Sequence, residues 1–253
     1  MQPALAVAQP APPPEDPVEY EAAYVHAIYR TAARHFSHTR SRPWPIVSCF
    51  CKSVKATDVF LDCGCGNGRN MGLTPAVELG FDYSIELCDC ARSLASHLTI
   101  VQADALQIPC RTAVVDSAIC IAVIHHFSTR DRRISAFREL WRVLVPGGKA
   151  LVTLWAREQG GRELPSDALV PWRSDPSNPV HQISIQEEPD VKGLGLRTIP
   201  RYYHMYTERE AREDAERGGF LVEECIDDAG NWALILRRGK NGGDAEAPVH
   251  RGR

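Results

Sequence analysis

The stretch DVFLDCGCGNGRN, residues 58–70, constrains the fold more than any other part of this sequence. An apolar run that suits a buried strand leads directly into three glycines at every second position, Gly64, Gly66 and Gly68. Glycine permits the tight turn that must follow such a strand, and it lets the backbone approach a ligand closely. The stretch therefore predicts a strand that carries a ligand-binding loop at its carboxyl end.

Strand-like and helix-like segments alternate around this loop. Strands are predicted over residues 58–63, 84–89, 98–104, 114–124 and 149–156, and helices over residues 18–35, 69–80 and 130–144. Near the end, the Thr-x-x-Glu pattern at 207–210 predicts the start of a helix, and residues 220–228 and 231–238 predict an antiparallel hairpin. This alternation favours an α/β fold with a doubly wound, mostly parallel sheet.

Composition divides the chain into one domain and two tails. Residues 1–17 are rich in Ala and Pro without Lys or Arg and predict a disordered leader; residues 239–253 predict a disordered tail. The domain then covers residues 18–238, and residues 157–199 predict a partly irregular insertion over the substrate face of the sheet. No apolar run approaches the ~20 residues of a membrane span.

Net charge excludes a globally basic nucleic-acid binder, since it is −3. Arginines cluster around residues 30–42 and 130–133, so a local basic face remains possible as an interpretation. Nine cysteines without a secretion signal favour free thiols in a reducing compartment. Six of them form Cys-x-Cys pairs, a spacing shorter than that of usual zinc sites, so we expect buried thiols and no metal.

Three acids complete a ligand pocket at the predicted strand ends. Asp62 precedes the glycine loop, Asp89 ends the predicted second strand, and Asp104 ends the third. Carboxylates at these places can accept an ammonium group, ribose hydroxyls and the amine of adenine. Glycines spaced as G-x-G-x-G differ from the G-x-G-x-x-G of dinucleotide enzymes, so S-adenosylmethionine is favoured over NAD or an empty sheet. Ala105 and Ala122 are predicted as further cofactor contacts.

These residues resemble the class I S-adenosylmethionine-dependent methyltransferases, whose fold is a doubly wound, seven-stranded, mostly parallel sheet that ends in an antiparallel hairpin. The resemblance covers residues 58–238, and the segment VLVPGGKALV fits it. It implies the Rossmann-like fold and S-adenosylmethionine as the cofactor.

Five further stretches narrow the resemblance: HFSHTRSRPWP at 35–45, IAVIHHFSTRDRR at 121–133, LWAREQ at 154–159, LVPW at 169–172 and RYYHMY…GNW at 201–232. Their combination is similar to the eukaryotic tRNA wobble-uridine carboxymethyl methyltransferases. Those enzymes methylate the carboxylate of 5-carboxymethyluridine at the wobble position and produce a methyl ester. The resemblance also implies a heterodimer with a small zinc-binding activator protein that covers an apolar sheet edge. This chain departs from the pattern in its short 157–199 insertion.

The motif residues supply groups suited to a carboxylate and a base. As catalytic residues the resemblance implies His35, Arg40, His125, His126 and Arg201. As substrate-binding residues it implies Trp44, Arg132, Tyr203, Asn231 and Trp232. In a regular strand one of the two adjacent histidines would point away from the site, and the choice between them stays open. Trp232 suits the core as well as a stacking surface, and the arginines at 130–133 suit a solvated face as well as a phosphate contact.

Two other functions remain as alternatives at this stage. A quinone- or sterol-type small-molecule methyltransferase would share the glycine loop and the acids, and a silent methyltransferase-like scaffold would share the fold. Activity on tRNA distinguishes a tRNA methyltransferase from a small-molecule methyltransferase, and cofactor binding distinguishes either enzyme from a silent scaffold. We expect the chain in the cytoplasm, with the nucleus as a second compartment.

Overall fold

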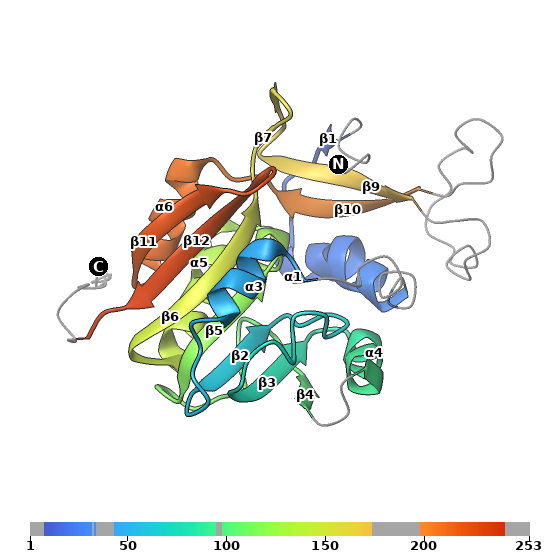
Figure 1. Ribbon diagram of the computed structural model, residues 1–253. Helices are drawn as coiled ribbons and strands as arrows, with labels where there is room; N and C mark the ends of the chain where they lie inside the picture. The colour runs from blue at the N-terminus through green and yellow to red at the C-terminus, as the bar shows by residue number, and fades with distance from the viewer. Residues whose placement is uncertain (1–7, 32, 34–42, 95–97, 174–197, 241–253) are drawn as a thin grey trace, which may run out of the picture.

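The computed structural model describes residues 8–31, 33, 43–94, 98–173 and 198–240, and a seven-stranded sheet forms the centre of this part (Figure 1). The strand order is β11-β12-β6-β5-β2-β3-β4. The strands are β2 (Val59–Cys63), β3 (Val77–Asp82), β4 (Thr99–Gln102), β5 (Val115–Ile121), β6 (Leu144–Trp155), β11 (Phe220–Asp227) and β12 (Asn231–Arg238). The first five are parallel, and the β11–β12 hairpin joins β6 antiparallel. The predicted fold class is confirmed.

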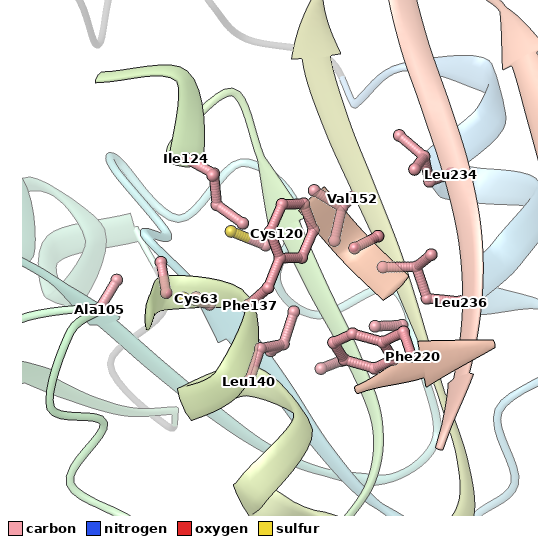
Figure 2. Packing of buried hydrophobic residues seen from close by; sticks show 14 of the residues in the cluster. Cys63, Ala105, Cys120, Ile124, Phe137, Leu140, Val152, Phe220, Leu234 and Leu236 are labelled. Carbon is pink, nitrogen blue, oxygen red and sulfur yellow. The ribbon is translucent and has the colours of Figure 1, made fainter. Parts of the chain in front are cut away.

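Helices cover both faces of the sheet. They are α3 (Pro45–Cys51), α4 (Ile85–Leu94), α5 (Arg130–Val143) and α6 (Glu208–Arg217). Side chains of a strand alternate between the faces, so Phe60 packs with α3 while its neighbour Leu61 packs with α5. On the α5 side, Phe137 and Leu140 meet Val152 of β6 and the hairpin residues Leu234 and Leu236 (Figure 2).

The C-terminal elements follow their sequence signals closely. Thr207 is the N-cap of α6, and its hydroxyl accepts a hydrogen bond from the Glu210 amide, as the capping pattern predicts. Between β11 and β12, Ala229 and Gly230 both have positive φ angles, of 49° and 86°. Two such residues in succession suit the tight turn of a hairpin.

The second strand differs from its prediction. Residues 84–89 were expected as a strand and residues 69–80 as a helix, whereas residues 77–82 form β3 and residues 85–94 form α4. The Ser84 hydroxyl accepts a hydrogen bond from the Leu87 amide and so starts α4. Gly80, which was interpreted as a helix end, lies inside β3. A Cβ at this position would lie 2.6 Å from Met71 Sδ, so glycine serves the close packing of Met71 on the strand. The strand therefore ends on Asp82 and not on Asp89.

A small second sheet crosses the carboxyl ends of the large one. It consists of β1 (Gln9–Pro10), β9 (Asp167–Arg173) and β10 (Thr198–His204), and a short hairpin, β7 (Glu158–Gln159) and β8 (Arg162–Glu163), precedes it. Within the expected irregular insertion, residues 158–159, 162–163 and 167–173 are thus strands. Residues 9–10 pair with β9, which differs from the disordered leader expected over residues 1–17. Of that insertion, residues 174–197 lie outside the described part, as do residues 241–253 of the expected tail.

None of the nine cysteines, all within the described ranges, forms a disulfide, and most of them are partly or fully buried. Within the described ranges, no group of three His, Cys, Asp or Glu side chains could hold a metal ion. In the same ranges, no helix has the length and apolar character needed to cross a membrane.

The N-terminal helix lies between the small sheet and the ends of β2 and β3 (Figure 1). It begins as α1 (Pro17–Glu21), continues as the wider turn η2 (Ala22–His26), and remains helical over residues 27–31. One buried carboxylate fixes it: Glu21 accepts hydrogen bonds from the Ser128 amide at 2.7 Å, the Ser128 hydroxyl at 2.9 Å and the Arg132 guanidinium at 2.8–3.1 Å. The helix is thereby attached to the segment that follows β5.

We predict that Glu21→Gln lowers the free energy of unfolding by about 1.5–3 kcal/mol, because hydrogen bonds to a charged group are lost in a buried place. The matched control is Glu19→Gln, an exposed acid two residues earlier on the same helix, with a loss below about 1 kcal/mol. Urea unfolding midpoints of both variants test this expectation. Equal midpoints would mean that Glu21 does not hold the helix.

Candidate active site

A cleft of roughly 950 Å³, open on one side to solvent, lies at the carboxyl ends of the parallel strands. Open α/β sheets bind their ligands at this end. The glycine loop, the loops after β3, β4 and β5, and the N-terminal helix contribute to its wall. Lining residues used below are Val25, His26, Tyr29, Gly64, Gly66, Arg69, Asn70, Asp82, Tyr83, Asp104, Ala105, Ala122 and His126.

The glycine loop has the conformation that its sequence predicts. Gly64, Gly66 and Gly68 have φ angles of 75°, 56° and 77°, values that favour glycine. A Cβ on Gly64 would lie 2.3 Å from Val123 Cγ2, and one on Gly68 would lie 3.0 Å from the Cβ of Ala91 in α4. Gly64 therefore lets the loops after β2 and β5 meet, and Gly68, which does not line the cleft, lets the loop pack on α4.

Asp82 occupies the place that the sequence analysis gave to Asp89. It ends β3, lines the cleft, and accepts hydrogen bonds from the Gly66 amide and the Ser84 amide, both at 2.9 Å. Burial raises the pKa of Asp82 to about 6, and the backbone N–H groups partly offset this effect. Asp89 instead lies on α4, with a side chain 67% exposed and paired with Arg92. The prediction that Asp89 ends the second strand was wrong, because that strand lies earlier in the sequence.

Asp62 is fully buried beneath the glycine loop and does not line the cleft. Neither of its carboxylate oxygens accepts a hydrogen bond within the described part of the chain. Burial, followed by the charge of Asp82, raises the pKa of Asp62 to about 8, against the opposing effect of Arg69. A buried charge without donors is costly, so the carboxyl group is mostly protonated at pH 7 until a cation or a donor reaches the loop.

The third acid and its neighbours lie where the sequence predicts. Asp104 lines the cleft after β4 and accepts a hydrogen bond from the Leu106 amide through Oδ1, which leaves Oδ2 for a ligand. Ala105 and Ala122 line the same cleft. Ala122 has a φ angle of 59°, unusual for a residue with a Cβ, and its amide donates to the Thr153 hydroxyl at 3.0 Å. Such strain is typical of ligand sites.

The two histidines lie on η3 (Ile124–His126), a tight turn that follows β5, and both are buried. Strand alternation therefore does not separate them. Nδ1 of His125 accepts a hydrogen bond from the Trp155 amide at 3.1 Å, whereas Nδ1 of His126 lies 2.9 Å from the Tyr202 carbonyl oxygen. A carbonyl only accepts, so His126 carries a proton on Nδ1. Of the pair, His126 lines the cleft.

Arg201 and Tyr203 lie on β10 next to the histidines. Tyr203 is buried and stacks on Trp155, with ring centroids 4.0 Å apart and an interplanar angle of 9°, so it does not offer an open surface to a base. The Arg201 guanidinium lies 4.7 Å from the Tyr203 ring centroid and 5.2 Å from that of Tyr29. Arg201 and the His pair, far apart in sequence, are thus brought together.

Other predicted substrate residues lie elsewhere. Arg132 is paired with Glu21, so its charge is already compensated. Asn231 begins β12, where its side-chain amide donates to the Asp228 carbonyl, and Trp232 donates through Nε1 to the Tyr206 carbonyl; neither lines the cleft. Trp44 lies at the start of α3, with the Arg69 guanidinium 5.5 Å from its ring centroid, and so adjoins the cleft through Arg69. His35 and Arg40 lie outside the described residues.

The sequence analysis missed several lining residues on the N-terminal helix and after β3. The His26 ring stacks on that of Tyr83, with centroids 3.7 Å apart, at the cleft wall. The buried Asn70 Oδ1 also faces no donor among described residues. A signal existed for part of this set, since Glu21, Val25 and Tyr29 recur every four residues and so share one helix face.

His204 fixes β10 at its end. Its Nδ1 lies 2.9 Å from Asp167 Oδ1 of β9, and its Nε2 lies 2.9 Å from Glu210 Oε1 of α6. Burial acts to raise the pKa of Asp167, but hydrogen bonds from His204 and Tyr202 outweigh it and hold that pKa below its ordinary value. The contact ties the small sheet to the large domain and so places Arg201.

Comparisons with known proteins agree with this geometry. A sequence profile described as "Methyltransferase domain" matches residues 61–152. The tRNA (carboxymethyluridine(34)-5-O)-methyltransferase of Saccharomyces cerevisiae is 31% identical over 271 residues, covering 87% of this chain and 97% of that protein. The protein of the same name from Schizosaccharomyces pombe is 36% identical, with 87% and 99% covered.

The chain belongs to this family.

A solved structure of another methyltransferase shares the fold of this tRNA methyltransferase family member. The 1,6-didemethyltoxoflavin-N1-methyltransferase of Burkholderia thailandensis, solved with S-adenosylhomocysteine, has a TM-score of 0.63 at 16% identity, with 92% of this chain and 95% of that chain covered. At such identity the likeness concerns the fold alone. It agrees with the class I methyltransferase architecture expected from the sequence.

The cleft of the methyltransferase fits S-adenosylmethionine. Gly64 and Gly66 bring backbone without a side chain to its wall, while Asp82 and Asp104 present carboxylates at two neighbouring strand ends. Asn70 contributes to the wall a buried acceptor that lacks a donor within the described part, and Asp62 carries two more such acceptors beneath the glycine loop. Acceptors on one wall suit a ligand with hydroxyl, amine and ammonium groups.

For this methyltransferase we predict that Asp82→Asn weakens cofactor binding about 10- to 100-fold, because a charged acceptor in the cleft is lost. Asp89→Asn is the matched control and keeps the affinity within about twofold, since its carboxylate is exposed. Isothermal titration calorimetry with S-adenosylmethionine measures both. Equal losses would return the cofactor role to Asp89.

The Asp62 carboxyl group gives a pH dependence of binding. The cationic cofactor favours the ionised form, so binding releases a proton from a group whose pKa is about 8, and affinity should rise between pH 6 and 7.5. Asp62→Asn should show a smaller rise over the same range. Calorimetry in two buffers that differ in ionisation enthalpy counts the released protons, and identical counts for both proteins would refute this assignment.

Proposed function

We propose that the chain transfers the methyl group of S-adenosylmethionine to the carboxylate of 5-carboxymethyluridine at position 34 of tRNA. One observation carries the proposal: relatives of this name match 87% of the chain at 31–36% identity. The intact cleft agrees with it, because the glycine loop and the acids at the strand ends are in place. Nothing in the described part favours the small-molecule or scaffold alternatives.

The reaction needs positioning and no catalytic base. A carboxylate is already ionised at pH 7. One of its oxygens forms the new bond to the methyl carbon while the methyl–sulfur bond of the donor breaks and its electron pair stays on sulfur. The negative carboxylate and the positive sulfonium are both neutralised, and no proton moves. Alignment of the two reactants can supply ~7–11 kcal/mol of the barrier reduction in favourable cases.

The chain's residues divide this work between two walls. Asp82, Asp104 and the glycine loop would hold the methyl donor, and Arg201 with His126 would receive the substrate carboxylate beyond Ala122. Arg40 and His35 remain proposals of the sequence analysis for the same task. Trp44, next to Arg69 at the cleft border, is a proposed contact for the tRNA anticodon loop.

A partner protein would suit the β4 edge of the sheet. β4 is the outermost strand at this end, and Val101 on it and Val77 on β3 are 41% and 62% exposed. An exposed, apolar strand edge is prone to pair with another chain. The opposite edge, β11, carries the charged residues Glu223 and Glu224. We propose that a small zinc-binding activator covers β4 in a heterodimer, and that the enzyme works in the cytoplasm, with the nucleus as a second compartment.

The test is methyl transfer to tRNA from cells that lack the enzyme, with radiolabelled S-adenosylmethionine, followed by mild alkali. We expect label on tRNA that alkali removes, because a methyl ester is base-labile. The assay is run with and without the zinc-binding activator, and higher activity with it supports the heterodimer. Alkali-stable label, or none on tRNA in either sample, would overturn the proposed reaction.

A further inference from the structure

Arg201 is a buried cation without a carboxylate partner in the described residues. Its side chain belongs to a residue only 6% exposed, and no Asp or Glu oxygen of the described part lies within 4.0 Å of it. Its Nε also donates no hydrogen bond there. Arg133, also buried, faces Glu210 and Asp214 at 3.7 and 3.9 Å. A buried charge is costly unless compensated, so Arg201 suits an anionic ligand.

Tyr29 connects this cation to the cofactor cleft. Its hydroxyl lies 2.8 Å from Nε2 of His126 and accepts a hydrogen bond from Nη1 of Arg201 at 3.2 Å. Since Nδ1 of His126 donates to the Tyr202 carbonyl, Nε2 accepts the Tyr29 proton whenever the ring is neutral. The same side chain lines the cleft, and the Arg201 guanidinium packs over its ring. Sequence analysis gave Tyr29 no role.

We propose that Tyr29 is a positioning residue for the substrate carboxylate. Tyr29 and His126 line the cleft, and the Tyr29 hydroxyl holds the Arg201 guanidinium and the His126 ring in one arrangement beside it. The ion pair between Arg201 and the carboxylate then forms where the methyl donor can be reached. The proposal rests on the proposed function and adds a residue from the N-terminal helix to it. It also predicts that the enzyme selects a negatively charged substrate group over a neutral one of the same shape.

Charge selection follows from the unpaired guanidinium. A carboxymethyl group compensates the charge of Arg201, whereas the neutral carbamoylmethyl group of the same shape leaves it without a partner. This discrimination requires the Arg201 guanidinium to be held in one position. Loss of the Tyr29 hydroxyl should therefore weaken binding of carboxymethyl substrate more than binding of its carbamoyl analogue.

Tyr29→Phe removes the hydroxyl and keeps the ring that packs on Arg201. The matched control is Tyr20→Phe on the same helix, whose buried hydroxyl makes no hydrogen bond to a described residue. Both variants are assayed as full-length chains, with the activator present, on tRNA carrying 5-carboxymethyluridine, and inhibition by carbamoylmethyl tRNA is measured in parallel. Calorimetry gives the affinity for S-adenosylmethionine, and thermal unfolding gives Tm.

For Tyr29→Phe we expect kcat/KM for tRNA to fall about 10- to 100-fold, while cofactor affinity and inhibition by the carbamoyl tRNA stay within about twofold. Tyr20→Phe should match the wild type in all readings. Equal kcat/KM for the two variants, or a parallel loss of cofactor affinity and Tm in Tyr29→Phe, would overturn the proposal. A wild type that forms no alkali-labile label would instead overturn the proposed function, and this inference with it.

Discussion

One buried carboxylate, that of Glu21, holds the wall of the cleft that the large sheet cannot supply. Parallel strands place their carboxyl ends, and hence the glycine loop and the acids, along one edge of the sheet. Without the N-terminal helix, that edge would be open to water. Glu21 fixes the N-terminal helix to Ser128 and Arg132, and the helix then brings Val25, His26 and Tyr29 over the opening.

The electrostatics of the two walls are opposed. The donor wall holds acids whose pKa values burial raises, Asp62 to about 8 and Asp82 to about 6, and a cationic ligand relieves that cost. Arg201 lies beside the opposite wall, next to Tyr29, and an anionic ligand there would compensate its charge. In the proposed reaction each reactant would be attracted to its own side of the cleft. Transfer of the methyl group would neutralise both, so the product ester would no longer pair with Arg201.

The sequence predicted those parts of the fold that depend on local signals. The glycine loop, the helix after Thr207 and the turn at Ala229-Gly230 each follow from the conformational preferences of a few adjacent residues. The strand end was mispredicted at Asp89 because Gly80 was interpreted as the end of a helix. In the structure Gly80 serves close packing inside a strand, and the sequence pattern does not distinguish these two uses of glycine. Asn231, Trp232 and Arg132 show that a motif residue can serve the fold. Arg201 was named from the family resemblance, whereas the role of Tyr29 depends on contacts between distant segments, so local patterns could not give it.

The separation of these contacts along the chain has a consequence for biosynthesis. The partners of Glu21 lie 107 and 111 residues further on, and Arg201 follows Tyr29 by 172 residues. The N-terminal helix therefore has no place to dock until residue 132 has been translated, and Tyr29 contacts Arg201 only after β10 has emerged. Completion of the pocket thus waits for β10, and the inner hairpin strand β12 enters the sheet beside β6 later still.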